Sequence, residues 1–469
     1  MENKLTKQVE KFDGLLRKFV ATHSGMRQRD RNWYQAMGTT VGGSEVAALL
    51  GCNPYANVHD IVASKVALLR GKDSWAGGGA ACWWGVLFED IIAAYVEADL
   101  GMPVRGDELC VQRWPGHRNS PDGYIVARFA NAANSAANSA ANSSAAEFAE
   151  EFAKESAEES AEEFADKSAG TPPFQLWTTD MPEAAAVAAR ILLLEFKCPL
   201  SRLPTAGVPP QYRPQLWSGL AVSPVAHAGL FVDALFRKCA LADLGAGAAY
   251  DQEYHPTRVG AAPIVTAPLA WGLVGVYAPG MGAPAWVRRG WRAQAWTEGD
   301  PDPDTDSDAA MSAWRLRTEY SSKKSELVDF GGCPRALFDK ALNMLNLRRF
   351  QCCRLPACFA DGRGAALHSA DGIGAAIAKL QDEAPKDYEL LGVIPWKLFE
   401  VVYAPVTRHP DFHGLLAPLI ADVHRRVAEA LAAPDPEAHL RAARRSTAKP
   451  RVGRDAPSAA DIDALFGNE

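Results

Sequence analysis

The sequence predicts an α/β protein in which a central mixed sheet is flanked by helices. The apolar run at 191–194 is short and continuous, which is typical of a buried strand. A second strand is expected around 230–232, after a helix-like stretch. Between 84 and 95, apolar residues recur at intervals of three and four, which predicts a helix with one apolar face. Two buried strands and such a helix together indicate a layered α/β core.

Length and composition limit the class of protein. The chain has 469 residues, 48% of them hydrophobic, which is enough for two or three folded domains. No apolar run approaches the roughly 18 residues of a membrane span, so we expect no membrane partner. The N-terminus lacks the apolar region of a secretion signal, and the nine cysteines form no disulfide framework. We therefore expect an intracellular protein, in the host cytoplasm or nucleus if it is viral, and not a secreted one.

Composition divides the chain into five parts. Residues 1–130 and 176–250 are expected to be two parts of one core. Between them, 131–175 is a low-complexity insertion of Ala-Ala-Asn-Ser repeats and a Glu/Ala/Ser/Lys stretch. Residues 251–432 are a C-terminal α+β region of uncertain architecture. Residues 433–469 are expected to be a flexible basic tail.

The formal net charge of −7 gives no sign of a nucleic-acid partner over the whole chain. Any DNA site must therefore be a local basic surface. The basic tail either binds DNA phosphates or is simply solvated, and the sequence leaves both open. A helix is expected just before this tail, over 413–431.

Charged residues on two predicted strands point to metal-assisted phosphodiester hydrolysis. Side chains alternate along a strand, so Glu195 and Lys197 emerge on one face while Phe196 faces the opposite core. If Asp122 lies on the neighbouring strand, two carboxylates converge into an oxygen-ligand site suited to Mg²⁺ or Mn²⁺. Lys197 would then orient or deprotonate the attacking water.

Each of these pieces also has a plainer interpretation. Pro121-Asp122-Gly123 is the kind of tripeptide that most often forms a turn. Glu195 and Lys197 are spaced like an ordinary exposed pair on a strand. The residues alone therefore leave a structural role open beside the catalytic one.

Five sequence blocks accompany these residues over about 33–235, half of the chain. They are Trp33 with Gly42-Gly43-Ser44-Glu45 and Asn53-Pro54-Tyr55, then Trp84-Gly85 to Glu89, Ser120-Pro121-Asp122-Gly123, Glu195-Phe196-Lys197-Cys198-Pro199, and Tyr212-Arg213-Pro214-Gln215. In this order they resemble the YqaJ/lambda-exonuclease family of the PD-(D/E)XK nuclease superfamily. A weaker sixth block at 394–400, ahead of 408–412, resembles a C-terminal segment of long viral members.

The resemblance implies a restriction-endonuclease-like core and a set of metal ligands. Asp122, Glu195, Glu89 and the carbonyl of Phe196 would bind Mg²⁺ or Mn²⁺, with two ions expected. Lys197 would serve the attacking water. Glu89 lies at the flank of the apolar stripe of its predicted helix, where it either reaches the cleft or is a solvated surface residue.

Three further residues have roles that only the resemblance implies. Gln215 matches a glutamine that closes the active site, and Tyr212 lies about one helical turn before it. Ser44 matches a serine that contacts the terminal 5′-phosphate of DNA. The plainer alternatives are a surface glutamine near a helix start and an ordinary N-cap serine.

The sequence departs from the family pattern at Met37. Family exonucleases often have an arginine there, four residues after the tryptophan, which contacts the same phosphate. Arg29 or Arg31 would be the substitutes, but neither is in register. The insertion also separates Asp122 from Glu195, so the site requires that the insertion leave from a hairpin tip.

We therefore expect a Mg²⁺-dependent deoxyribonuclease, a 5′-to-3′ exonuclease on double-stranded DNA ends that acts in viral recombination, repair or genome processing. The resemblance also implies a single-strand-annealing protein as partner and a homotrimer around DNA. Met37 and the extra C-terminal region favour one alternative, an endonuclease of the same superfamily. A DNA-binding scaffold with a decayed nuclease site is the other alternative.

Overall fold

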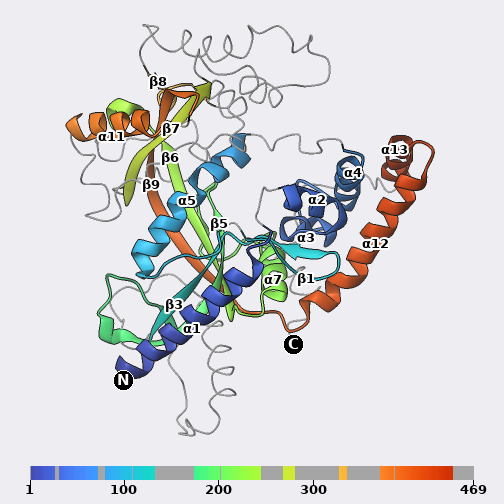
Figure 1. The fold of residues 1–469 in the computed structure, drawn as a ribbon, viewed down its shortest axis with the longest axis horizontal. Coiled ribbons are helices and arrows are strands. Elements are labelled where there is room, and N and C mark those ends of the chain that lie inside the picture. The colour runs from blue at the N-terminus through green and yellow to red at the C-terminus, as the bar shows by residue number, and fades with distance from the viewer. Residues whose placement is uncertain are drawn as a thin grey trace, which may run out of the picture.

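The computed structural model has a central mixed sheet flanked by helices, as predicted (Figure 1). It describes residues 2–26, 31–71, 80–107, 109–131, 174–200, 202–244, 268–279, 327–334, 338, 370–384 and 386–446. The strands are β1 (Val111–Trp114), β2 (His117–Asn119), β3 (Gly123–Asn131), β4 (Phe174–Leu176), β5 (Ala186–Lys197), β6 (Ala228–Lys238), β7 (Ala270–Pro279), β8 (Val328–Asp329) and β9 (Tyr388–Val406). Over these residues the main sheet has the order β4-β3-β5-β6-β9-β7, with β8 beside β9. Its β5–β6 pair is parallel and β3–β5 is antiparallel, so the sheet is mixed.

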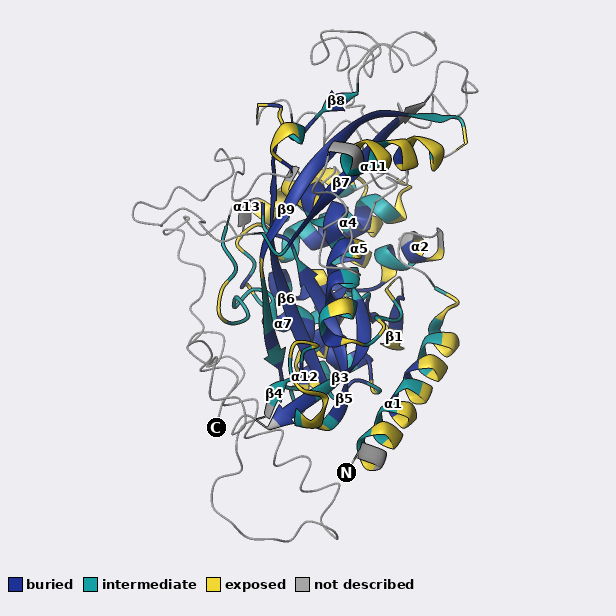
Figure 2. Cartoon of the chain, turned by 90° about the vertical axis from the view of Figure 1, so that its left-hand side faces the viewer, coloured by how far each residue is buried: buried dark blue, intermediate teal, exposed yellow. Residues whose placement is uncertain are grey.

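Helices cover both faces of this sheet. The helices are α1 (Glu2–His23), α2 (Arg31–Thr39), α3 (Gly43–Leu49), α4 (Val58–Leu69), α5 (Ala80–Leu100), α7 (Arg213–Val222), α11 (Ala370–Asp382), α12 (Phe412–Ala432) and α13 (Pro436–Ser446). Leu192 and Leu194 of β5 pack with the α5 side of the core, whereas Ile191 and Leu193 pack with α1 and α7. Figure 2 shows the strands buried between these layers. The expected strands at 191–194 and 230–232 are confirmed as parts of β5 and β6.

The low-complexity insertion leaves the core at one end of a hairpin. β3 and β4 pair antiparallel, and Asn131 at the end of β3 lies opposite Phe174 at the start of β4. Residues 132–173 lie outside the described residues, but the chain leaves and returns at neighbouring points of the sheet. The requirement that the insertion start from a hairpin tip is therefore met, and β3 pairs with β5 from Gly123 to Ala130.

The C-terminal region adds strands to the same sheet. β9 pairs antiparallel with β6 on one side and with β7 on the other, so residues 388–406 lie at the centre of this half. The sixth sequence block, 394–400, lies within β9. The helix expected over 413–431 is confirmed as α12, which packs against α4 through side chains such as Val62 and Val423.

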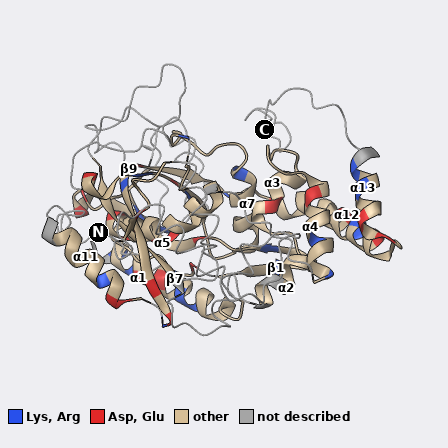
Figure 3. Ribbon diagram, turned by 90° about the horizontal axis from the view of Figure 1, so that it is seen from above, with Lys and Arg blue, Asp and Glu red and all other residues tan. Residues whose placement is uncertain are grey.

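The prediction of a flexible tail from residue 433 is wrong over its first part, because 436–446 form α13. Asp435 accepts a hydrogen bond from Ala438 N at 3.0 Å, and Pro436 follows it at the start of the helix, which is a common helix-start pattern. Arg444 lies 3.4 Å from Asp60 of α4. Acidic and basic residues are interspersed on α12 and α13, as Figure 3 shows. The rest of the tail, 447–469, lies outside the described residues.

No helix in the described part of the chain is both long enough and apolar enough to cross a lipid bilayer.

Candidate active site

Asp122 lies beside the end of β5, although it is far from β5 in sequence. Gly123 at the start of β3 pairs with Leu194, and Asp122 N donates to Leu194 O at 3.2 Å. Phe196 N, 74 positions further along the chain, donates to Asp122 Oδ2 at 2.6 Å. Pro121-Asp122-Gly123 therefore leads directly into a paired strand, which places the Asp122 carboxylate next to the acidic end of β5.

Glu195 and Lys197 share one face of β5, as the strand alternation predicted. The Glu195 side chain is 3% exposed and that of Lys197 is 23% exposed. Lys197 Nζ donates to a Glu195 carboxylate oxygen and, at 3.2 Å, to the carbonyl of Phe196. The Phe196 ring packs on the opposite side, in the core that contains α5. The two charged groups form a buried ion pair that opens to solvent on the lysine side.

Burial and neighbouring charges decide the protonation of this pair. Burial raises the pKa of Glu195, the Lys197 ammonium opposes this shift, and the charge of Glu89 adds to it. Burial acts to lower the pKa of Lys197, but the carboxylates of Glu195 and Asp122 outweigh it, so the pKa is raised. Lys197 is therefore a protonated donor at neutral pH.

Glu89 approaches this pair from α5. The apolar stripe predicted for this helix is confirmed, since Trp84, Leu87, Phe88, Ile91 and Tyr95 are all buried. Glu89 is half-buried at the flank of the stripe, whereas its neighbour Asp90 is exposed. Its effect on the pKa of Glu195 places Glu89 within electrostatic reach of the β5 carboxylate.

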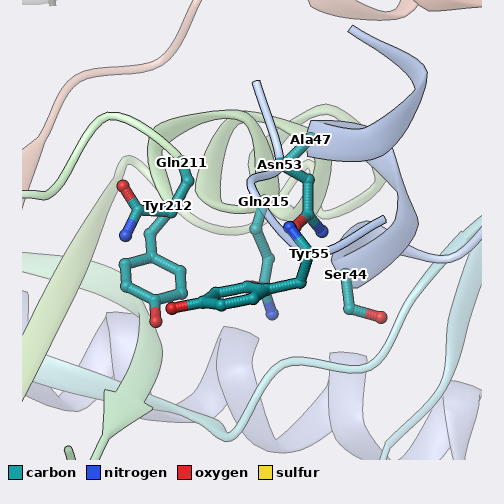
Figure 4. A pocket seen from close by; sticks show the side chains of 7 residues that line it. All are labelled: Ser44, Ala47, Asn53, Tyr55, Gln211, Tyr212 and Gln215. Carbon is teal, nitrogen blue, oxygen red and sulfur yellow. The ribbon is translucent and has the colours of Figure 1, made fainter. Parts of the chain in front are cut away.

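Ser44, Tyr212 and Gln215 line one pocket of about 70 Å³ (Figure 4). Ser44 comes from α3, while Gln215 lies in the first turn of α7, just after Tyr212. The Tyr212 ring lies 5.2 Å from Lys197 Nζ and stacks on Phe231 of β6 at 5.5 Å. This contact connects the pocket to the Asp122–Glu195–Lys197 group.

Ser44 is not an N-cap residue, so the plainer alternative for it is wrong. The N-cap of α3 is Gly42, whose N–H donates to Glu45 Oε2 at 2.7 Å. Ser44 lies one position further into the helix and its side chain is exposed. Its hydroxyl is thus available to a ligand.

An arginine that the sequence did not single out lies beside Trp33 and the start of α3. Arg118 is 4% exposed and donates from Nε to Thr40 Oγ1 at 2.8 Å. Its guanidinium carbon lies 5.1 Å from the centre of the Trp33 ring, and a Cβ atom on Gly42 would lie 3.2 Å from Nη2. A buried cation therefore lies against the start of α3. The sequence signal for it was its place in β2, just before the Ser120-Pro121-Asp122 block.

A second group of residues that the sequence missed holds the loop after β5. Asp233 on β6 is fully buried and stands in register with Lys197. Arg202 binds both of its carboxylate oxygens, with Nη2 3.0 Å from Oδ1. Arg237, also on β6, donates to Pro199 O at 3.2 Å. These contacts fix the segment that leads from Lys197 to Tyr212.

The oxygen groups near the ends of β3 and β5 fit a hard divalent cation. The carboxylates of Asp122, Glu195 and Glu89 and the carbonyl of Phe196 are the kinds of donor that Mg²⁺ and Mn²⁺ prefer. A carboxylate as deeply buried as that of Glu195 needs a cation beside it, and Lys197 provides one here. Within the described ranges, no three His, Cys, Asp or Glu side chains form a ready-made metal-ligand cluster.

The region that contains this site is similar to known proteins. Residues 32–226 match the family model of the YqaJ-like viral recombinase domain. Protein D345L of African swine fever virus, Vero-adapted Badajoz strain, is 30% identical over 253 residues, which cover 53% of this chain and 59% of that protein. The same protein of the Malawi tick isolate is also 30% identical over the same shares. The chain thus spans somewhat more than half of the length of these curated relatives. Over residues 32–226 this chain is therefore similar to the YqaJ-like viral recombinase domain family.

Proposed function

We propose that the chain is a Mg²⁺-dependent deoxyribonuclease that degrades double-stranded DNA from its ends, 5′ to 3′, in viral recombination, repair or genome processing. One observation carries this proposal: Asp122 lies against the end of the strand that presents the Glu195–Lys197 pair. The similarity of residues 32–226 to a viral recombinase domain supports DNA as the substrate.

Each residue of the site has a separate role in the proposed reaction. Asp122, Glu195, Glu89 and the Phe196 carbonyl would hold Mg²⁺ or Mn²⁺, which when bound neutralises negative charge at the scissile phosphate. Lys197 is protonated, so it would orient the attacking water or stabilise phosphate charge by donating hydrogen bonds, rather than act as a base. Gln215 would close the site from α7.

Arg118 supports recognition of a 5′-phosphate in spite of Met37. Methionine cannot donate a hydrogen bond to phosphate, whereas Arg118 places a guanidinium against Gly42, two residues before Ser44. Arg118→Ala should lower the preference for 5′-phosphorylated over 5′-hydroxyl duplexes by up to about tenfold, because its buried guanidinium next to the start of α3 attracts an anion there without touching it. Arg113→Ala removes an exposed arginine of the neighbouring strand β1 and should leave the preference unchanged.

The test of the main proposal is digestion of end-labelled duplexes, with and without a 5′-phosphate, in Mg²⁺ and in EDTA. We expect cleavage only with the metal, and Lys197→Ala should slow it by at least about 100-fold while DNA binding is retained. Lys379→Ala, at an exposed lysine of α11, is the matched control. Cleavage by Lys197→Ala at the wild-type rate would refute the assignment.

An endonuclease is the second candidate function, favoured by Met37 and by the extension of the sheet through β9. Covalently closed circular DNA separates the two activities, because an obligate exonuclease requires an end. Cutting of closed circles would exclude the exonuclease and support the endonuclease.

A further inference from the structure

Tyr55 is unusually exposed for an aromatic residue beside a pocket. Its side chain is 91% exposed, whereas the next most exposed large apolar residue in the described part of the chain, Val187, is 48% exposed. The ring lines the pocket and reaches towards Tyr212 (Figure 4). Within the described part of the chain, such a ring offers an aromatic face that is left open to solvent.

The loop that carries Tyr55 is held firmly, although the ring itself is uncovered. Gly51 adopts a φ of +74°, which lets the chain reverse directly after α3. Cys52 N and Asn53 N both donate to Ala47 O, at 2.9 and 3.1 Å. Tyr55 N donates to Asn53 Oδ1 at 2.8 Å. A fixed backbone lowers the entropy cost of binding a flat ligand against the ring.

The chemistry of the pocket matches a nucleobase. The amides of Asn53, Gln211 and Gln215 line it together with two tyrosines. Amide groups both donate and accept hydrogen bonds, as base edges do, and aromatic faces stack on any base. The Tyr212 ring is 5.2 Å from Lys197 Nζ, so a base held here belongs to a nucleotide close to the proposed scissile phosphate.

We infer that Tyr55 stacks on the terminal nucleobase of the DNA strand that enters the active site. The inference rests on the proposed function for the location of the cleaved phosphate. The exposed ring can stack on the face of one base while the amides beside it contact the edge of that base.

The experiment uses the full chain and an oligonucleotide duplex with 2-aminopurine at its 5′ end, in Ca²⁺ so that binding is measured without turnover. The bound oligonucleotide should emit more strongly with Tyr55→Ala than with wild type, because the stacking contact is lost. Its affinity should fall roughly tenfold, whereas Tyr55→Trp should retain both the affinity and the low emission. Val187→Ala, on β5, is the control for an exposed apolar residue and should match wild type.

Equal emission and equal affinity for wild type and Tyr55→Ala would overturn the inference, and so would a wild type that leaves the emission unchanged. The proposed function is tested separately, because it fails if Lys197→Ala cleaves DNA in Mg²⁺ at the wild-type rate. Loss of cleavage in Lys197→Ala together with normal binding by Tyr55→Ala would refute the stacking contact and leave the proposed function standing.

Discussion

Replacing Lys65 with methionine removes the cation that joins α2, α3 and α4. The Lys65 side chain on α4 is 1% exposed, and Nζ lies 3.0 Å from both carboxylate oxygens of Glu45. It also donates to Thr40 O at 2.5 Å and to Met37 O at 3.1 Å. The substitution keeps most of the side-chain volume but removes the Lys65 ammonium from these four acceptors, of which Glu45 Oε2 keeps the donor Gly42 N.

The contacts set the size of the effect. Removing one partner of a buried ion pair costs about 3–5 kcal/mol. The Glu45 side chain is 22% exposed, so water can partly replace the lost donor, and we expect the lower end of that range, about 3 kcal/mol of unfolding free energy. Glu45 also accepts from Gly42 N, just before Ser44, so the start of α3 should loosen and the 5′-phosphate preference should fall as well.

Urea unfolding, followed by circular dichroism and tryptophan fluorescence, measures the change. The control is Lys379→Met, because Lys379 is 59% exposed and pairs with Glu383 at 3.7 Å. Surface pairs of this kind contribute less than about 1 kcal/mol. A Lys65→Met variant within about 1 kcal/mol of wild type would refute the reasoning.

Two predictions concern pH. Burial raises the pKa of Glu195 above the ordinary value of 4.5, so acidification neutralises Glu195 at a higher pH than an exposed carboxylate. Cleavage measured as kcat/KM in Mg²⁺ should fall correspondingly early, and a rate unchanged down to about pH 4.5 would contradict this. Burial also lowers the pKa of His117 from 6.5 to about 4, and its nitrogens face Ser218 Oγ at 2.8 Å and His413 Nδ1 at 3.0 Å. The unfolded state then binds more protons, so the unfolding free energy should fall by about 3 kcal/mol as pH drops from 6.5 to 4, and His117→Gln should abolish this loss. Urea unfolding of both proteins across this window checks it, and an equal pH dependence would contradict it.

The local part of the candidate site followed from sequence periodicity. Alternation along a strand was enough to place Glu195 and Lys197 on one face, and the helical stripe was enough to place Glu89 at a flank. Both patterns depend on neighbours within a few residues, so the long insertion does not disturb them.

The residues that the sequence missed depend on contacts between distant segments. Arg118 is singled out by its approach to Gly42. Tyr55 belongs to one of the sequence blocks, but its role is indicated only by its place in a pocket shared with α7. Neither contact leaves a periodic signal. From the sequence alone, Asp233 is only one residue of a predicted buried strand, and its role becomes visible through the contact with Arg202.

The C-terminal errors have similar causes. Residues 433–469 were predicted to be a flexible basic tail, although Asp435 and Pro436 form a helix-start pattern that is visible in the sequence. The pairing of β9 with β6 joins residues far apart in the chain, and strand order over such separations follows from packing rather than from local pattern.

Calorimetric titration of Mn²⁺ into the free protein addresses the ion site without requiring turnover. We predict that wild type binds Mn²⁺, that Asp122→Asn and Glu195→Gln each weaken binding by at least about tenfold, and that Asp90→Asn, at the exposed acid beside Glu89, does not. Equal affinity in wild type, Asp122→Asn and Glu195→Gln would contradict the claim that these two carboxylates hold the ion.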